Sequence, residues 1–224
     1  MYLDFFGLEE KPFKNTPDPA FFFASTNHRQ ASTTVTRGIE DRCGLVLLVG
    51  DIGTGKTTIC SHIQSIECCS AAYLNNPYLT EVEFLEKVNT ELGIPVGDQS
   101  RKGLTDELRQ YLEREAGSGR IVMLFVDEAH RLGLPVLDQI LMLSNLQSAD
   151  EHLLQIILAA QPEFLDTLRH PRLRSLSQRI GVRYHLQSMD RADTIAYVNH
   201  RLKKAGCGDH SLFSKRALEA IWKA

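Results

Sequence analysis

Residues 45–57 read Leu-Val-Leu-Leu-Val-Gly-Asp-Ile-Gly-Thr-Gly-Lys-Thr, and this stretch decides the fold. The unbroken apolar run at its start predicts a strand that is covered on both faces, as strands of a parallel sheet are. The glycine-rich segment Gly50–Thr57 matches G-x-x-x-x-G-K-[ST] at every fixed position, and a helical pattern follows it. Strand, glycine loop and helix in this order predict a P-loop domain.

The chemistry of this loop points to a nucleoside triphosphate. Glycines let backbone N–H groups turn inward around phosphate oxygens, and the helix N-terminus adds positive potential. We expect Lys56 to reach the β- and γ-phosphates of ATP and the Thr57 hydroxyl to bind Mg²⁺. The alternative is a glycine-rich turn with a chance Lys-Thr pair. The predicted nucleotide-binding residues are Gly50, Asp51, Ile52, Gly53, Thr54, Gly55, Lys56, Thr57 and Thr58.

Two adjacent carboxylates follow another apolar run. Residues 121–126 lead directly into Asp127 and Glu128. Carboxylates at the end of a buried strand are costly unless they meet a cation or donors, and ligands of open α/β sheets bind at that end of the strands. We predict that Asp127 holds Mg²⁺ with Thr57 and that Glu128 orients or deprotonates the attacking water. The alternative is an acidic helix start that interacts with the helix dipole.

Two further polar residues lie near these positions. His130 either couples the site to a neighbouring element or is a surface histidine, and the letters Asp-Glu-Ala-His do not decide between the two. Gln161 directly follows the apolar run 153–160. Its side chain at the tip of that predicted strand can contact the γ-phosphate or the water, or it can simply begin a helix before Pro162.

A basic run with no acidic residue extends from 167 to 189. It contains five arginines and two histidines: Arg169, Arg172, Arg174, Arg179, Arg183, His170 and His185. Three interpretations compete: an arginine finger that reaches a neighbouring subunit's γ-phosphate, a patch that contacts the DNA backbone, and a solvated face with local ion pairs. Arg174 and Arg179 flank a predicted turn and are our candidates for the catalytic finger.

Strand and helix patterns alternate along most of the chain. Strands are predicted at 45–49, 71–74, 121–126, 153–159 and 182–186, and helices at 27–40, 56–70, 80–93, 104–116, 134–146 and 162–169. This order predicts an α/β, three-layer parallel sheet. We expect an aromatic and proline-rich segment at 1–30 packed on the ATPase core at 31–188. The helices predicted at 190–205 and 214–224 begin a C-terminal helical lid at 189–224.

Composition excludes some classes of protein. The 224 residues carry a net charge of -3, so the chain is not a polycation that binds nucleic acid by bulk charge. No apolar run approaches the roughly 20 residues that span a bilayer. The N-terminus has neither a basic region nor a cleavage site, and it is therefore not predicted to be a signal peptide.

Several motifs occur together in a characteristic order. They are residues 2–8 (Tyr-Leu-Asp-Phe-Phe-Gly-Leu), 11–13 (Lys-Pro-Phe), 16–19 (Thr-Pro-Asp-Pro), His28 with Gln30-Ala31, the P-loop, 124–130, 155–164 with Gln161-Pro162-Glu163, and 178–180 (Gln-Arg-Ile). With these motifs the chain resembles, over essentially its whole length, the ExeA/GspA group of AAA+ ATPases of general (type II) secretion. Pilus-biogenesis and TnsC- or MuB-like transposition ATPases share much of the pattern.

The resemblance implies an AAA+ fold, ATP-driven homo-oligomerisation and an arginine that acts in trans. It further implies the cytoplasmic domain of a bacterial inner-membrane protein, with a membrane segment beyond this chain, that assembles a secretion or pilus complex. The alternatives are a DNA-associated transposition ATPase and a nucleotide-gated scaffold with little turnover. In the family a lid arginine is expected just after Ala224, and turnover by this chain alone is then expected to be slow.

Overall fold

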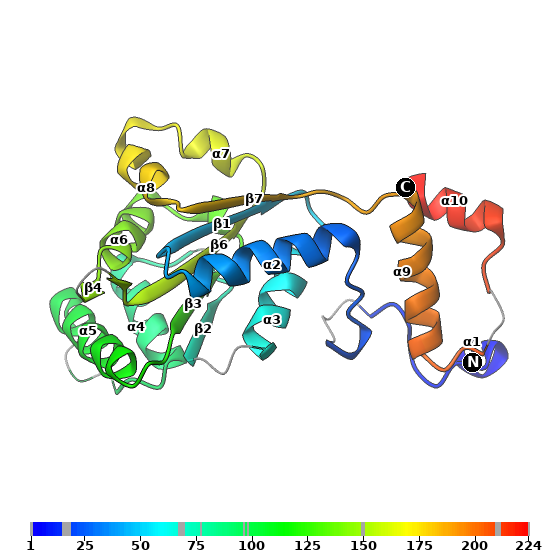
Figure 1. Cartoon of the computed structure of the whole chain (residues 1–224), viewed down its shortest axis with the longest axis horizontal. Coiled ribbons are helices and arrows are strands. Elements are labelled where there is room, and N and C mark those ends of the chain that lie inside the picture. Colours follow the sequence, from blue (N-terminus) through cyan, green and yellow to red (C-terminus); the bar gives the residue numbers. More distant parts are fainter. Residues whose placement is uncertain are drawn as a thin grey trace.

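A parallel five-stranded sheet forms the centre of the computed structural model (Figure 1), which describes residues 2–14, 19–66, 70–76, 78–95, 97, 99–148, 151–208 and 212–223. The strand order is β2-β3-β6-β1-β7, with all neighbours parallel. The strands are β1 (Leu45–Gly50), β2 (Ser70–Leu74), β3 (Val122–Val126), β6 (Leu154–Ala160) and β7 (Val182–Leu186). All five predicted strands are confirmed to within one residue at each end.

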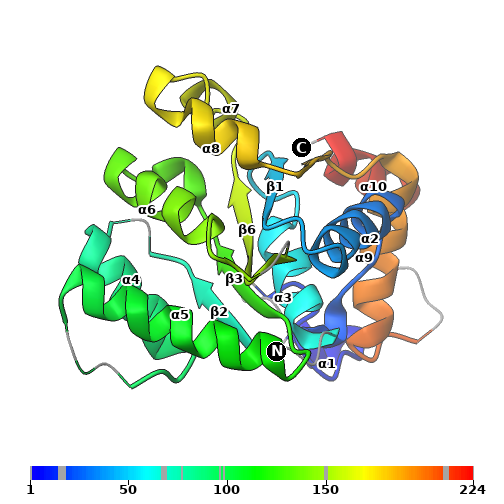
Figure 2. The ribbon, with the colours of Figure 1, turned by 60° about the vertical axis from the view of Figure 1, so that its left-hand side comes forward.

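Helices cover both faces of the sheet (Figures 1 and 2). Side chains alternate along each strand, so Val46 and Leu48 face one core while Leu45 and Leu47 face the other. The first core is closed by α2 (Thr26–Glu40) and α3 (Lys56–Ile66). The second is closed by α4 (Glu81–Glu91), α5 (Arg101–Gly117), α6 (Leu134–Ser144) and α8 (Arg174–Arg179). The predicted α/β three-layer class is confirmed.

Local signals define several helix starts. A capping box begins α4, because the Thr80 side chain accepts from the Glu83 N–H while the Glu83 carboxylate accepts from the Thr80 N–H. The side chains of Ser25 and Asp190 cap α2 and α9 by accepting from the N–H groups of His28 and Asp193. Since each cap acts within three residues, the starts of these helices depend on local sequence.

The structure also contains elements that the sequence did not predict. They are α1 (Tyr2–Phe6), α8, and a small antiparallel pair formed by β4 (Gln147–Ser148) and β5 (Glu151–His152). The predicted helix at 162–169 is shorter, as α7 (Phe164–Thr167). Arg174 and Arg179 were expected to flank a turn, and instead they begin and end α8, because the buried Leu176 fixes this segment against the core.

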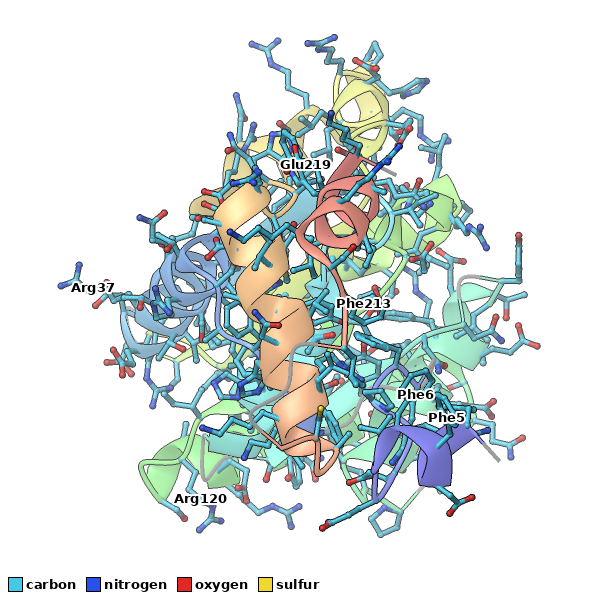
Figure 3. The ribbon with its side chains drawn as sticks, turned by 90° about the vertical axis from the view of Figure 1, so that its right-hand side faces the viewer. Phe5, Phe6, Arg37, Arg120, Phe213 and Glu219 are labelled. Atoms are coloured by element: carbon cyan, nitrogen blue, oxygen red, sulfur yellow. The ribbon has the colours of Figure 1, made fainter. Side chains whose placement is uncertain are left out.

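The two C-terminal helices stand beyond the end of the sheet (Figure 1). They are α9 (Arg191–Lys204) and α10 (Lys215–Lys223), and an ion pair of 2.6 Å between Arg191 and Glu219 joins them. Figure 3 looks onto α9, with Glu219 near one of its ends and Phe5 and Phe6 of α1 near the other. Ala224 lies outside the described residues.

The N-terminal segment is expected to pack on the ATPase core, and several of its residues contact the lid helix α9. Leu8 and Phe21 share a buried cluster with Val198 and Leu202 of α9, and the Glu9 N–H donates to the Ala205 carbonyl at 2.8 Å. These contacts arise because α9 offers an apolar face that the sheet does not cover. Residues 16–18 of the family motif lie outside the described residues.

Other residues of the segment contact the core. The Phe22 ring stacks on His62 of α3, with 4.4 Å between the ring centroids. The segment therefore joins the lid helices to the helix that follows the P-loop. In the described part of the chain, no helix combines the length and the apolar character needed to cross a bilayer.

Candidate active site

The P-loop connects the end of β1 to the start of α3 and depends on its glycines. Gly53 and Gly55 have φ values of 79° and 94°, in the left-handed region that residues with a Cβ rarely adopt. A Cβ at Gly50 would lie 2.7 Å from the Leu186 carbonyl oxygen of β7. Glycine is thus required both by the backbone turn and by the close approach of the neighbouring strand.

Lys56 is buried inside this loop. Its Nζ donates to the carbonyl oxygens of Gly50 at 2.7 Å and Asp51 at 2.8 Å. A buried ammonium needs such acceptors, because burial without them costs several kcal/mol. The charge is held where the first turn of α3 presents N–H groups without intrahelical acceptors. Side chain and backbone together form a cradle suited to an anion.

The predicted magnesium residues are in direct contact. The Thr57 Oγ1 donates to Asp127 Oδ2 at 2.6 Å, although 70 residues separate the two in the chain. The Tyr73 hydroxyl donates to the same oxygen at 2.9 Å, and the Glu128 N–H donates to Oδ1 at 2.9 Å. Hydroxyl and carboxylate oxygens are ligands that Mg²⁺ prefers, so the residues present fit this ion.

Glu128 follows Asp127 in an unusual backbone conformation. Its φ of 53° lies in the left-handed region, which is uncommon for a residue with a side chain and is found preferentially at functional sites. Its carboxylate is 3.5 Å from His130 Nε2 and 3.7 Å from Arg131 Nε. The turn after β3 therefore directs the carboxylate towards the side chains of His130 and Arg131.

The strand order explains how Gln161 joins these residues. β6 lies between β1 and β3, so the residue after β6 lies between the P-loop and the carboxylates. The Gln161 backbone N–H donates to His130 Nδ1 at 3.4 Å. Of the two open interpretations of His130, the structure supports coupling, because the ring connects Glu128 to the end of β6.

Comparison with known proteins agrees with this geometry. A family model described as an AAA domain matches residues 39–168, which include both the P-loop and the carboxylates. The chain belongs to the AAA domain family. It is also 40% identical to "General secretion pathway protein A" of Aeromonas hydrophila over 99% of its length, and it spans 41% of that relative. The resemblance to the ExeA/GspA group is confirmed.

Solved structures share the fold of this AAA domain. The ORC2 protein of Aeropyrum pernix, solved as ADPNP-ADP complexes, has a TM-score of 0.67 at 16% identity, with 95% of this chain and 59% of that chain covered. Cdc6p of Pyrobaculum aerophilum has a TM-score of 0.67 at 17% identity, with coverages of 92% and 58%. At this identity the likeness establishes the AAA+ fold alone.

A hollow of about 500 Å³ lies beside the P-loop of the AAA domain. One wall comes from the N-terminal segment and α2, with Phe22, Phe23 and His28. The opposite wall comes from the lid helices, with Tyr197, Arg201 and Trp222. We expected the aromatic residues to serve mainly in packing, and Phe21, which also lines the hollow, is only 2% exposed.

The basic run divides into paired and unpaired arginines. Arg169 pairs with Asp166, Arg172 pairs with Asp138, and Arg183 donates to Ser177. Arg174 and Arg179 are exposed, and within the described residues neither has an ion-pair partner. The solvated-face interpretation thus suits the three paired arginines best.

Arg179 cannot reach the P-loop of its own AAA domain. The Gly181 N–H bonds to the Leu45 carbonyl at 3.0 Å, so Arg179 lies beside the beginning of β1. The P-loop follows the end of this strand, and at about 3.3 Å per residue the strand is roughly 20 Å long. Any contact between this arginine and a P-loop has to involve another subunit.

Sequence reasoning missed three residues of the site. Tyr73 is the next-to-last residue of β2, with no polar motif around it, and only the pairing of β2 with β3 brings it to Asp127. Tyr197 and Trp222 come from helices far along the chain. An aromatic residue at the carboxyl end of a predicted strand was the one available signal for Tyr73, since ligands bind at that end.

Proposed function

We propose that this AAA domain binds and hydrolyses ATP with Mg²⁺. The observation that carries the proposal is the 2.6 Å contact between Thr57 at the start of α3 and Asp127 at the end of β3. This contact joins an anion cradle to a carboxylate at the crevice where open α/β sheets bind ligands. A glycine-rich turn with a chance Lys-Thr pair has no reason to meet a buried carboxylate.

Each residue has a distinct part in the proposed reaction. Lys56 and the loop N–H groups bind the phosphates, while Thr57 and Asp127 hold Mg²⁺, which when bound neutralises charge that develops on the phosphate oxygens. Glu128 accepts a proton from the attacking water or orients it. His130 holds the Glu128 carboxylate at 3.5 Å, and Gln161 lies at the adjacent strand end, within reach of the same water or phosphate.

The biological role that we propose is ATP-driven assembly of a bacterial envelope complex, of secretion or pilus type. The relative named "General secretion pathway protein A" supports this role over DNA transposition. We propose that the domain acts in the cytoplasm as a homo-oligomer, since ATP is available there and the unpaired arginines suit a neighbouring subunit. A membrane segment, where present, lies outside this chain.

Equilibrium binding and turnover test the proposed function. The chain has one tryptophan, Trp222, which lines the hollow, so its fluorescence should change when ATP or ADP binds. We expect saturable binding of both nucleotides and Mg²⁺-dependent release of phosphate. Binding without turnover would favour the scaffold alternative, and stimulation by DNA with steep salt dependence would favour the transposition alternative.

A trans arginine predicts that activity depends on concentration. ATPase activity per subunit should rise with protein concentration, because the finger comes from a neighbour. Replacing the finger, Arg174 or Arg179, with alanine should lower kcat at least about 100-fold, whereas Arg172→Ala, which removes an arginine paired within its own chain, should have little effect. A flat specific activity across concentrations contradicts the trans contact.

Mixing two inactive variants identifies the finger directly. A finger variant retains its own P-loop and Glu128, while a Glu128→Gln chain retains its arginines. In a mixed oligomer the second chain supplies the arginine to the first, and activity should reappear. If neither Arg174→Ala nor Arg179→Ala is complemented in this way, the finger is a different residue.

The contact between Tyr73 and Asp127 predicts that removal of the Tyr73 hydroxyl changes the Mg²⁺ concentration that ATPase activity requires. The hydroxyl donates to Asp127, and burial, followed by the nearby Asp127 charge, raises the pKa of Tyr73, which keeps the phenol protonated. Tyr73→Phe removes this donor and should raise the Mg²⁺ concentration for half-maximal ATPase activity about tenfold. Tyr111→Phe on α5 is the matched control. An unchanged magnesium titration would show that Thr57 and the Glu128 N–H suffice to hold Asp127.

A further inference from the structure

A side chain from outside the sheet and α3 contacts the P-loop, and the proposed mechanism does not use it. His28 of α2 is 3% exposed, and its Nε2 lies 2.9 Å from the Thr54 carbonyl oxygen. Its other ring nitrogen, Nδ1, lies 2.6 Å from Ser25 Oγ. We propose that His28 is a positioning residue that aims a backbone N–H of the P-loop at the phosphates. The inference rests on the proposed ATP binding.

The chemistry of the two partners determines the state of the ring. A carbonyl oxygen only accepts, so His28 Nε2 carries the proton and donates to Thr54. In the neutral ring Nδ1 is then an acceptor, and the Ser25 hydroxyl donates a hydrogen bond to it. Burial lowers the pKa of His28, which agrees with a neutral ring. Both nitrogens are satisfied, and the ring orientation is fixed at two points.

The geometry of the peptide bond converts this contact into control of an N–H group. In a planar trans peptide, the C=O of one residue and the N–H of the next point in opposite directions. Anchoring the Thr54 carbonyl on His28 therefore directs the Gly55 N–H away from α2. Gly55 directly precedes Lys56, so this N–H lies at the turn that leads into α3. His28 thus holds one donor of the anion cradle in place before any phosphate arrives.

The glycine at position 55 is part of the same arrangement. A Cβ added to Gly55 would lie 2.6 Å from His28 Nε2, closer than Cβ atoms approach other atoms. With a φ of 94° and this neighbour, position 55 accommodates only glycine. The His28 ring is therefore packed closely against the P-loop, and a small displacement of the ring moves the peptide between Thr54 and Gly55.

The test is to measure phosphate-dependent affinity in variants of His28. His28→Leu keeps apolar volume without a donor, and its Kd for ADP and for ATP should rise about tenfold, the usual effect of losing one well-placed hydrogen bond. Its Kd for adenosine, measured by ligand-observed NMR, should stay within about twofold, since adenosine carries no phosphate. His28→Gln places an amide N–H at the reach of Nε2 and should restore most of the ADP affinity.

Controls separate this role from a structural one. His62→Leu changes another histidine that contacts the same Phe22 ring and should leave the Kd for ADP unchanged. His28→Asn retains a polar amide that is too short to reach Thr54, and it should behave like His28→Leu. If His28→Leu does not fold, the inference is tested by comparing the ADP affinities of His28→Asn and His28→Gln.

Three outcomes overturn the inference. One is wild-type ADP affinity in His28→Leu or His28→Asn. Another is an equal loss of affinity for adenosine and for ADP, which would mean that His28 only lines the hollow. The third is a Kd for ADP in His28→Gln that is as high as the Kd in His28→Leu. If the wild-type chain binds neither ADP nor ATP, the proposed function itself fails, and this result is distinct from the other three.

Discussion

Replacing Lys56 with alanine is expected to abolish ATP binding. The Nζ is buried inside the loop and is held by the Gly50 and Asp51 carbonyls, so its charge is already positioned among the loop N–H groups. Loss of one partner of a desolvated, hydrogen-bonded charge pair typically costs about 2–5 kcal/mol, and the Kd for ATP should therefore rise at least about 30-fold. Trp222 fluorescence or calorimetry measures this change.

A second lysine provides the control. Lys87→Ala removes an exposed lysine of α4 that pairs with Glu91, and it should bind ATP as the wild type does. Thermal unfolding should show that Lys56→Ala remains folded, because the substitution removes a buried charge rather than core volume. Full ATP affinity in Lys56→Ala would place the nucleotide elsewhere and refute the site.

Replacing Glu128 with glutamine is expected to retain ATP binding and to lose hydrolysis. Glutamine has nearly the same shape as glutamate but cannot accept the proton of the attacking water. General base catalysis typically contributes 10²–10⁴-fold, so kcat should fall by about that factor. The Kd for ATP should change by less than about threefold, because no phosphate contact is assigned to this side chain.

Two further variants help to interpret the result for Glu128→Gln. Glu113→Gln on the exposed face of α5 is the matched control and should leave kcat unchanged. His130→Ala should lower kcat less than Glu128→Gln does, since the histidine acts through the carboxylate at 3.5 Å. Normal turnover by Glu128→Gln would mean that the base is another group and that the left-handed backbone at this position has a different cause.

The sequence was sufficient where the physical cause is local. Apolar runs such as 45–49 and 121–126 predict buried strands, and the residues that end them are therefore near each other at one edge of a parallel sheet. The spacing within Gly50–Thr57 specifies a loop that only glycines can form. The capping box at Thr80 begins a helix by hydrogen bonds within four residues. None of these conclusions needs a contact from a distant part of the chain.

Tertiary structure decided the contacts between segments that are far apart in the sequence. The placement of β6 between β1 and β3 brings His130 and Gln161 together, and the pairing of β2 with β3 brings Tyr73 to Asp127. Among the described residues, Arg169 and Arg172 of the basic run meet acidic side chains and Arg183 meets Ser177, whereas Arg174 and Arg179 have no ion-pair partner. Periodicity and composition contain no information about these distances.

The N-terminal segment shows the same division. Its aromatic and proline residues predict a segment that covers an apolar surface, and the sequence alone determines that much. Which surface it covers follows from the fold, because α9 lies beyond the sheet with an apolar face that Leu8 and Phe21 bury. The same fold places His28 under the P-loop. Local sterics and burial thus define the catalytic loop, whereas the position of its distant partners depends on how the whole chain packs.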